Sequence, residues 1–346
     1  MKSNFTNQQR KQAEPPRNDE NNTEIELDIS SLLPVPTSDV EQVERNWDGV
    51  RLYLYQGVWC PIFVFKALQS FQKNFKANDT DIVLASLPKS GTTWLKALLY
   101  SIVNRDRFPI DQTPLLTNNP HKLISSFECH YFFNQDNPDD LGNIAQPRLF
   151  STHLPHQVLA SSLIKSKCKI VYVSRNPLDQ FISEREFLLK NRFLPDFEAL
   201  SVEQSFDMFC RGVHAFGPFW DHILGYWRAS MENPDRVLFL KYEDMKRDPV
   251  SNVDKIADFL GLPFSDDEKK QGLIQEISKY CSFEHLKNLE INKTGVHHKY
   301  VNNSTFFRKG EIGDWKNHLS SDMAERMKQV MDAKLSASGI SFDASS

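Results

Sequence analysis

The segment from Leu87 to Trp94 contains residues that can bind an anion. It reads Leu-Pro-Lys-Ser-Gly-Thr-Thr-Trp, with one cation, three hydroxyl groups and a glycine on which the chain can turn at Gly91. A short apolar run precedes it and a helical pattern follows, so the segment is expected to end a strand and begin a helix. Backbone N–H groups at a helix start attract anions, and the helix dipole strengthens the attraction. The segment therefore predicts a phosphate site that includes Lys89. An ordinary capped turn is the alternative interpretation, and the Walker A spacing of glycines and lysine is absent.

Arg175 and Ser183 form a second candidate anion site. Arg175 follows another apolar run, and Ser183 lies eight residues later. Asn176 and Pro177 are typical of a helix start, which would place Ser183 about two turns along that helix. An arginine fork and a hydroxyl can hold a second phosphate group. For these two residues taken alone, a surface ion pair and a solvated serine is the better supported interpretation.

Two further segments contain residues that can take a proton or bind an anion. His153 ends a short extended segment, where a neutral imidazole can take a proton near pH 7. For this residue taken alone, a hydrogen-bonded structural histidine is the favoured interpretation. His156 lies three residues on, but no third ligand is evident, so no metal site is expected. Between aromatic residues, Arg308 and Lys309 precede Gly310 and could clamp a phosphate, whereas the alternative is a solvated basic turn.

The elements that would position these residues alternate along the chain. Three apolar runs predict buried strands, at 81–87, 169–174 and 237–241. Apolar residues at helical spacing predict helices over 95–103, 253–260 and 323–331, the last opened by a capping pair of Asp322 and Glu325. Alternation of this kind predicts an α/β fold with a central parallel sheet flanked by helices. Such sheets bind ligands beyond the carboxyl ends of their strands.

Composition narrows the class of protein. The chain has 346 residues with a formal net charge of −4, so a broad basic surface for nucleic acid is not expected. No apolar run approaches the roughly 18 residues of a membrane span, and the N-terminus lacks the apolar core of a secretory signal. Residues 1–24 are polar and are expected to be disordered. Residues 41–342 are expected to form one domain. Five scattered cysteines favour a reducing cytosol.

Taken in order, the motifs resemble those of the cytosolic sulfotransferases. They are PKSGTTW, STHLP, RNP with its following serine, YED and FFRKGEIGDW. Two further stretches, Leu52–Trp59 and Cys281–Lys293, resemble the plant-type soluble branch. The resemblance extends from about residue 41 to the C-terminus. It implies a single α/β domain with a P-loop-like phosphosulfate-binding loop after the first core strand.

The resemblance also implies an activity and residue roles. It implies transfer of a sulfuryl group from the co-substrate 3′-phosphoadenylyl sulfate (PAPS) to a hydroxyl of a small acceptor, by in-line attack and without a metal. His153 matches the general base, and Lys89 would offset charge on the leaving oxygen. The residues that match donor contacts are Lys89, Ser90, Gly91, Thr92, Thr93 and Trp94 at the 5′-phosphosulfate, Arg175, Ser183, Arg308, Lys309 and Gly310 at the 3′-phosphate, and Tyr242 with Trp94 at the adenine.

The resemblance favours flavonoid-like phenols as acceptors, with steroid-like, hydroxyjasmonate or desulfoglucosinolate acceptors as alternatives. One departure concerns Glu184, Arg185 and Glu186, where the family often has aromatic residues and a histidine. These charges either border the acceptor pocket and alter acceptor choice or face solvent. Ser320 and Ser321 depart from the animal dimerisation pattern, so a monomer or weak homodimer is expected. The expected location is the cytoplasm, with neither nucleic acid nor membrane as partner.

Two other functions are alternatives to this one. A nucleotide kinase or ATPase would need a Walker A loop, which is missing, and a carboxylate for Mg²⁺. A non-catalytic nucleotide-binding or acceptor-binding protein of the same fold has support only from the altered stretch at 184–186. The presence of Lys89, His153 and Arg175 argues against it.

Overall fold

A computed structural model describes residues 40–133, 141, 144–191, 194, 196–297 and 301–342. The predicted disordered segment at 1–24 lies outside these residues. In the described part of the chain, no helix combines the length and apolarity needed to cross a membrane. Nor does this part contain a group of three or more histidine, cysteine, aspartate or glutamate side chains placed to hold a metal ion.

A four-stranded parallel sheet forms the centre of the fold. Its strand order is β5 (Leu149–Thr152), β4 (Ile82–Ser86), β6 (Lys169–Ser174) and β7 (Val237–Lys241). All three predicted strands are confirmed: β6 and β7 have the predicted bounds, and β4 is one residue shorter at each end than the predicted 81–87. Every residue of β4 is buried, because helices cover both faces of the sheet. The predicted α/β fold with a central parallel sheet is therefore confirmed.

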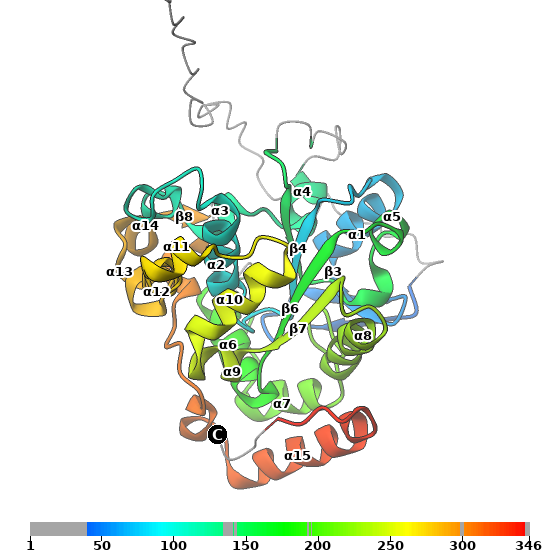
Figure 1. The fold of residues 1–346 in the computed structure, drawn as a ribbon. Helices are drawn as coiled ribbons and strands as arrows, with labels where there is room; N and C mark the ends of the chain where they lie inside the picture. The colour runs from blue at the N-terminus through cyan, green and yellow to red at the C-terminus, as the bar shows by residue number, and fades with distance from the viewer. Residues whose placement is uncertain are drawn as a thin grey trace, which may run out of the picture. The chain divides into compact units, whose positions relative to one another are not determined.

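Helices cover the two faces of this sheet (Figure 1). On one face lie α2 (Thr92–Asn104) and α10 (Pro249–Phe259), whose apolar side chains join those of β4 and β6 in one buried cluster. On the other face lie α1 (Ile62–Asn74) and α8 (Phe219–Glu232). Tyr226 of α8 stacks on Tyr172 of β6 with ring centroids 4.3 Å apart. Burying large apolar side chains contributes about 1.5–3 kcal/mol each, which makes this layered core the main stabilising feature.

Side-chain caps begin two of the longer helices. Helix α6 (Pro177–Lys190) follows β6 directly, and the Asn176 side chain caps it by accepting from Leu178 N at 3.0 Å, as the sequence predicts. Helix α15 (Ser321–Leu335) contains the predicted C-terminal helix. Its cap differs from the prediction, because Ser320 Oγ accepts from Met323 N at 3.3 Å in place of the expected acidic pair. A serine one residue before a helix is a common cap, and its short side chain reaches the free N–H groups.

Smaller elements complete the described chain. An antiparallel sheet contains β1 (Gln42–Arg45), β2 (Arg51–Tyr55) and β3 (Val58–Pro61), and a hairpin contains β8 (Val296–His297) and β9 (Val301–Asn302). The remaining α-helices are α3 (Pro120–Leu123), α4 (Phe127–Phe133), α5 (Ser161–Lys165), α7 (Val202–Cys210), α9 (Tyr242–Arg247), α11 (Asp266–Lys270), α12 (Leu273–Tyr280), α13 (Phe283–Asn288) and α14 (Glu290–Thr294). The 3₁₀ helices are η3 (Ile110–Gln112), η4 (Pro114–Leu116), η5 (His156–Val158), η6 (Asn303–Phe306), η7 (Asp314–Asn317) and η8 (Ser336–Ser338).

Candidate active site

A cavity of about 130 Å³ lies beyond the carboxyl ends of the central strands. All the predicted site residues except Ser90 and Lys309 line it: Lys89, Gly91, Thr92, Thr93, Trp94, His153, Arg175, Ser183, Tyr242, Arg308 and Gly310. These residues come from five separate stretches of sequence. The topology of the sheet brings them together, because consecutive parallel strands end at the same edge.

The loop between β4 and α2 turns into the helix at Gly91. This glycine has φ of +109°, and a Cβ there would lie 2.9 Å from the ring of Tyr242. Both facts require glycine, since other residues avoid this conformation and the ring leaves no room. Ser90 is buried and its N–H donates to Leu87 O at 3.3 Å, while the hydroxyls of Thr92 and Ser86 lie 2.7 Å apart. The loop is therefore held by its own contacts in a shape that presents the start of α2 to the cavity.

Lys89 carries an ammonium group with few protein partners. Its Nζ lies 4.4 Å from the centre of the Phe187 ring and 3.5 Å from Thr305 O. In the described part of the chain it contacts no carboxylate within ion-pair distance. Burial, together with the nearby Arg175 and Arg308, lowers the pKa of Lys89 to about 7. A partly buried cation among cations fits an anionic ligand, which would supply the missing counter-charge.

Arg175 and Arg308 each carry one unpartnered donor. Arg175 donates to Glu311 O at 2.5 Å, pairs with Asp179 at 3.5 Å and lies 4.6 Å above the centre of the Tyr242 ring. The Nε atoms of both arginines are buried and have no hydrogen-bond partner within the described residues. Buried donors without partners are rare and unfavourable, so a ligand oxygen or water is expected there. The two arginines thus fit a phosphate group, and the buried Ser183 hydroxyl lies in the same lining.

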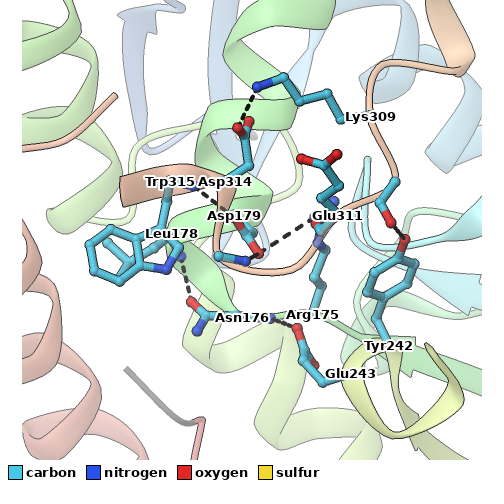
Figure 2. A network of polar contacts seen from close by, with 12 residues as sticks. Arg175, Asn176, Leu178, Asp179, Tyr242, Glu243, Lys309, Glu311, Asp314 and Trp315 are labelled. Carbon is cyan, nitrogen blue, oxygen red and sulfur yellow. Dashed lines mark hydrogen bonds and ion pairs between the residues drawn. The ribbon is translucent and has the colours of Figure 1, made fainter. Parts of the chain in front are cut away.

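A network of polar contacts shapes the loop that carries Arg308 (Figure 2). Asp314 accepts from Arg308 and, at 2.5 Å, from Lys309, so Lys309 is turned to Asp314 and lies outside the cavity lining. Asp179 accepts from the backbone N–H of Gly313 at 2.8 Å and that of Trp315 at 3.0 Å. These carboxylates fix the loop against α6.

The charge of Asp314 is held by its partners. Burial on its own would raise the pKa of this carboxyl, but hydrogen bonds from Lys309, Asn317 and Arg308 hold the pKa well below its usual range. The carboxylate is therefore ionised at neutral pH and keeps the two basic side chains in place.

Another contact fixes the same loop from the other side. Tyr242 OH donates to Gly310 O at 3.0 Å, and the Tyr242 ring meets that of Trp94 edge to face at 5.7 Å. Gly310 has φ of +69°, and a Cβ there would lie 2.7 Å from the Phe283 ring. Trp94, Tyr242 and Phe283 give this part of the cavity the aromatic walls that a flat base requires.

His153 is arranged as a proton acceptor. Its Nδ1 lies 2.7 Å from Ser86 O, and a carbonyl oxygen only accepts, so the ring proton is on Nδ1. The other ring nitrogen, Nε2, then has a free lone pair. Burial lowers the pKa of His153, while the Glu128 carboxylate and the hydrogen bond to Ser86 act in the opposite direction. The imidazole is therefore neutral at neutral pH, which is the state that a general base requires.

The backbone of His153 is held as firmly as its ring. Its N–H donates to Glu128 Oε1 at 2.6 Å, and its carbonyl oxygen lies 2.9 Å from Nε2 of the buried His222. Nδ1 of His222 lies 3.0 Å from Tyr172 OH. Burial lowers the pKa of His222 to about 3, so this ring is neutral and donates its Nε2 proton to His153 O. These contacts fix the position of the imidazole relative to the cavity.

Sequence reasoning missed one polar residue of the lining, His121. Its Nε2 lies 2.8 Å from Thr93 Oγ1, its Nδ1 lies 3.1 Å from Lys96 Nζ, and its ring stacks on Phe306 at 4.1 Å. Residues 121 and 306 are far apart in sequence, so no local spacing could predict the stack. The only local signal was an asparagine–proline pair before the histidine, which is typical of the short helix α3.

Glu184, the first residue of the charged stretch at 184–186, neither borders the cavity nor faces solvent, which were the two expectations. Glu184 is buried and does not line the cavity. It accepts from Gln180 Nε2 at 2.6 Å, and the same nitrogen donates to Pro88 O at 3.0 Å. Burial raises the pKa of Glu184 to about 8. This carboxyl therefore supports the loop that carries Lys89, where the sequence suggested an acceptor contact or a solvated charge.

Comparison with known proteins agrees with this geometry. Residues 79–339 match the family model described as the sulfotransferase domain. Cytosolic sulfotransferase 6 of Arabidopsis thaliana is 46% identical over 329 residues, which is 94% of this chain and 97% of the relative. Flavonol 4′-sulfotransferase of Flaveria chlorifolia is 44% identical over 299 residues, which is 84% of this chain and 90% of the relative.

A solved structure gives the same result. The crystal structure of a mouse sulfotransferase complexed with PAP superposes with a TM-score of 0.63 and 27% identity, and the match covers 83% of this chain and 95% of the mouse chain. The agreement extends over most of both chains.

Proposed function

The chain belongs to the sulfotransferase family, and on that premise we propose that it transfers a sulfuryl group from PAPS to a hydroxyl of a small acceptor with His153 as general base. The observation that carries the proposal is one cavity with two kinds of group. It contains a neutral imidazole whose Nε2 lone pair is free, and it contains the Lys89 ammonium beside two arginines whose Nε donors have no partner among the described residues.

The donor would be held mainly by the groups without protein partners. Arg175, Ser183 and Arg308 fit the 3′-phosphate, because the arginine Nε atoms are unpartnered donors. The loop from Lys89 to Trp94 fits the 5′-phosphosulfate through its cation, its hydroxyls and the start of α2. Trp94 and Tyr242 would flank the adenine. The mouse relative is a complex with PAP, which supports a nucleotide in the same edge of the fold.

His153, Lys89 and Ser86 have separate roles in the transfer. His153 Nε2 takes the proton of the acceptor hydroxyl, whose oxygen bonds to sulfur as the bond between sulfur and the bridging oxygen of the donor breaks. Lys89 and the N–H groups at the start of α2 stabilise charge that develops on the leaving oxygen. Ser86 O holds the His153 proton on Nδ1, so that the reactive nitrogen is the one without a hydrogen.

We infer a flavonoid-like phenol as the first acceptor class to examine. A relative of 44% identity is named a flavonol 4′-sulfotransferase. The rings of Phe187 and Phe306 lie 5.6 Å apart in the cavity lining and suit a flat aromatic acceptor. Steroid-like, hydroxyjasmonate and desulfoglucosinolate acceptors are alternatives for the same hydroxyl chemistry. The names of the Arabidopsis relatives support a cytoplasmic location, and a monomer or weak homodimer remains part of the proposal.

Binding of two nucleotides to Arg175→Ala tests the donor assignment. The variant should bind adenosine 3′,5′-bisphosphate about 10–100-fold more weakly, because charged hydrogen bonds to the 3′-phosphate are lost. Adenosine 5′-phosphosulfate lacks that phosphate, so its affinity should change far less. Titration calorimetry on both nucleotides makes the comparison, with the exposed Arg247→Ala as matched control. Equal weakening of both nucleotides would show that Arg175 does not bind the 3′-phosphate.

A further inference from the structure

Thr93, Lys96 and His121 form a hydrogen-bonded chain that leads from the core to the cavity. Lys96 is buried on α2, and its Nζ lies 2.8 Å from Ile124 O and 3.1 Å from His121 Nδ1. His121 Nε2 lies 2.8 Å from Thr93 Oγ1. Both His121 and Thr93 line the cavity, whereas Lys96 does not. These hydrogen bonds thus support the loop from Lys89 to Trp94 on the side away from the cavity.

The direction of the hydrogen bonds follows from which atoms have lone pairs. A lysine ammonium has three N–H donors and no acceptor, so His121 Nδ1 must accept from it. A neutral imidazole that accepts at Nδ1 carries its proton on Nε2. Burial, with the charge of Lys96 next, holds the pKa of His121 well below its usual range, so the ring is neutral. His121 Nε2 therefore donates to Thr93 Oγ1.

This direction decides what the Thr93 hydroxyl can do. Its oxygen accepts from His121, so its own hydrogen is available to a further acceptor. Thr93 is in the first turn of α2, where the backbone N–H groups also attract anions. Without the imidazole, the hydroxyl could turn its hydrogen away from the cavity.

The ring of His121 is held so that it cannot give up this orientation easily. It stacks on Phe306 with centroids 4.1 Å apart and an interplanar angle of 21°. Its backbone N–H donates to Asn119 Oδ1 at 2.9 Å, and Asn119 Nδ2 in turn donates a hydrogen bond to Oδ1 of the buried Asn292 at 2.8 Å. The imidazole therefore has a fixed place as well as a fixed proton.

We propose that Lys96 and His121 are positioning residues for the donor, Lys96 by fixing the His121 proton on Nε2 and His121 by directing the Thr93 hydroxyl hydrogen toward the 5′ anion of the nucleotide. The inference rests on the proposed function, since it needs a nucleotide with a 5′-phosphate or phosphosulfate in this cavity. It assigns no proton transfer to His121, whose part is to orient a donor.

Binding of two nucleotides separates this role from a structural one. Adenosine 3′,5′-bisphosphate has the 5′ anion and adenosine 3′-monophosphate lacks it. In the full-length protein, Thr93→Val and His121→Leu should each weaken the bisphosphate about tenfold and leave the monophosphate within about twofold. The double variant should bind the bisphosphate no more weakly than Thr93→Val alone, because both changes remove the same hydrogen bond, the one from the Thr93 hydroxyl to the 5′ anion. His121→Gln, whose amide can donate to Thr93, should recover most of the affinity.

The opposite results would overturn the inference. Equal weakening of both nucleotides by His121→Leu would mean a structural role, and additive effects in the double variant would mean that His121 does not act through Thr93. If His121→Leu fails to melt cooperatively, Lys96→Met takes its place with the same expectations. Failure of the wild-type protein to bind the bisphosphate would contradict the proposed function itself, whereas tight wild-type binding that His121→Leu leaves intact would contradict only the inference.

Discussion

Lys89 is the residue whose protonation state depends most on a bound ligand. Its backbone has φ of +65°, which non-glycine residues adopt rarely, and the donation from Gln180 to Pro88 O fixes the residue just before it. Its ammonium is partly buried in the cavity lining beside two arginines. A surrounding structure that holds both an unfavourable backbone and an unfavourable charge is typical of a binding site.

Nucleotide binding should therefore take up a proton near neutral pH. Because the pKa of Lys89 is lowered to about 7, a large part of the free protein has a neutral amine at pH 7–8. An anion beside it favours the charged form, so its pKa rises and a proton enters. Titration calorimetry of adenosine 3′,5′-bisphosphate in buffers of different ionisation enthalpy measures this uptake.

Lys89→Met is the control for that measurement. It removes the titrating amine but leaves the protonation of the nucleotide itself, so it should take up less than the wild type at pH 7.5. The same uptake in both proteins would show that Lys89 is not the group that titrates.

At the scale of elements, the segment from Arg308 to Trp315 depends on carboxylates. Asp179 of α6 accepts from two backbone N–H groups of this segment, and Asp314 binds two of its basic side chains. The buried Asp314 has no exposed side-chain surface, so its charge is tolerated only because its partners are charged. This part of the cavity wall is thus fixed by these carboxylates as well as by the packing of Trp315 and Ile312.

Replacing Asp314 by Asn should destabilise the protein in a pH-dependent way. The pKa of Asp314 is lowered on folding, so its contribution is present above about pH 4, the usual value of the group, and is lost as the pH falls toward the folded-state value. At pH 7 the loss should be about 2 kcal/mol, the size of a charged hydrogen bond. Urea denaturation of both proteins at pH 7 and at pH values below 4 measures the difference.

The matched control is Asp254→Asn, which removes an exposed pair with Lys269 and should change stability by less than about 1 kcal/mol. An Asp314→Asn effect that stayed constant as the pH fell below 4 would contradict the assignment, because a protonated carboxyl no longer binds the cations.

The elements themselves were only partly predictable from the sequence. The strands of the central sheet are short runs buried on both faces, and such runs are recognised by composition alone. The strands β1 to β3 were not predicted. β1 is exposed throughout and has no buried face to produce a pattern, whereas β3 is buried throughout but has only four residues and ends at a proline. The cap of α15 was misassigned by two residues, since Ser320 and Asp322 are both good caps and only the backbone geometry decides between them.

At the scale of the whole molecule, the cavity is assembled from segments that lie far apart in sequence. The loop from Lys89 to Trp94, Arg175 and His153 could be identified from the order of motifs in the sequence, because each lies next to a strand end. The contacts of His121 with Phe306 and Lys96 form only in the tertiary structure. The same holds for the contact between Pro88 O and Gln180, the helix neighbour of Glu184. Contacts that form only in the tertiary structure have no signal in a single sequence.

We propose that the whole assembly transfers a sulfuryl group and that His153 takes the proton. The most direct measurement is transfer of labelled sulfate from PAPS to a panel of flavonoids, sterols, hydroxyjasmonates and desulfoglucosinolates. Wild type, His153→Ala and the nearby His156→Ala, which lies outside the cavity lining, are compared. Donor affinity is measured in parallel.

We predict transfer to at least one acceptor class by the wild type and by His156→Ala, with a loss of about 10²–10⁴-fold in kcat for His153→Ala. Donor affinity should be unchanged in His153→Ala, since His153 is assigned to the acceptor. Full activity in His153→Ala would contradict the assignment of the base. Tight donor binding by the wild type with no transfer to any acceptor would contradict the enzyme assignment and favour a nucleotide-binding protein of the same fold.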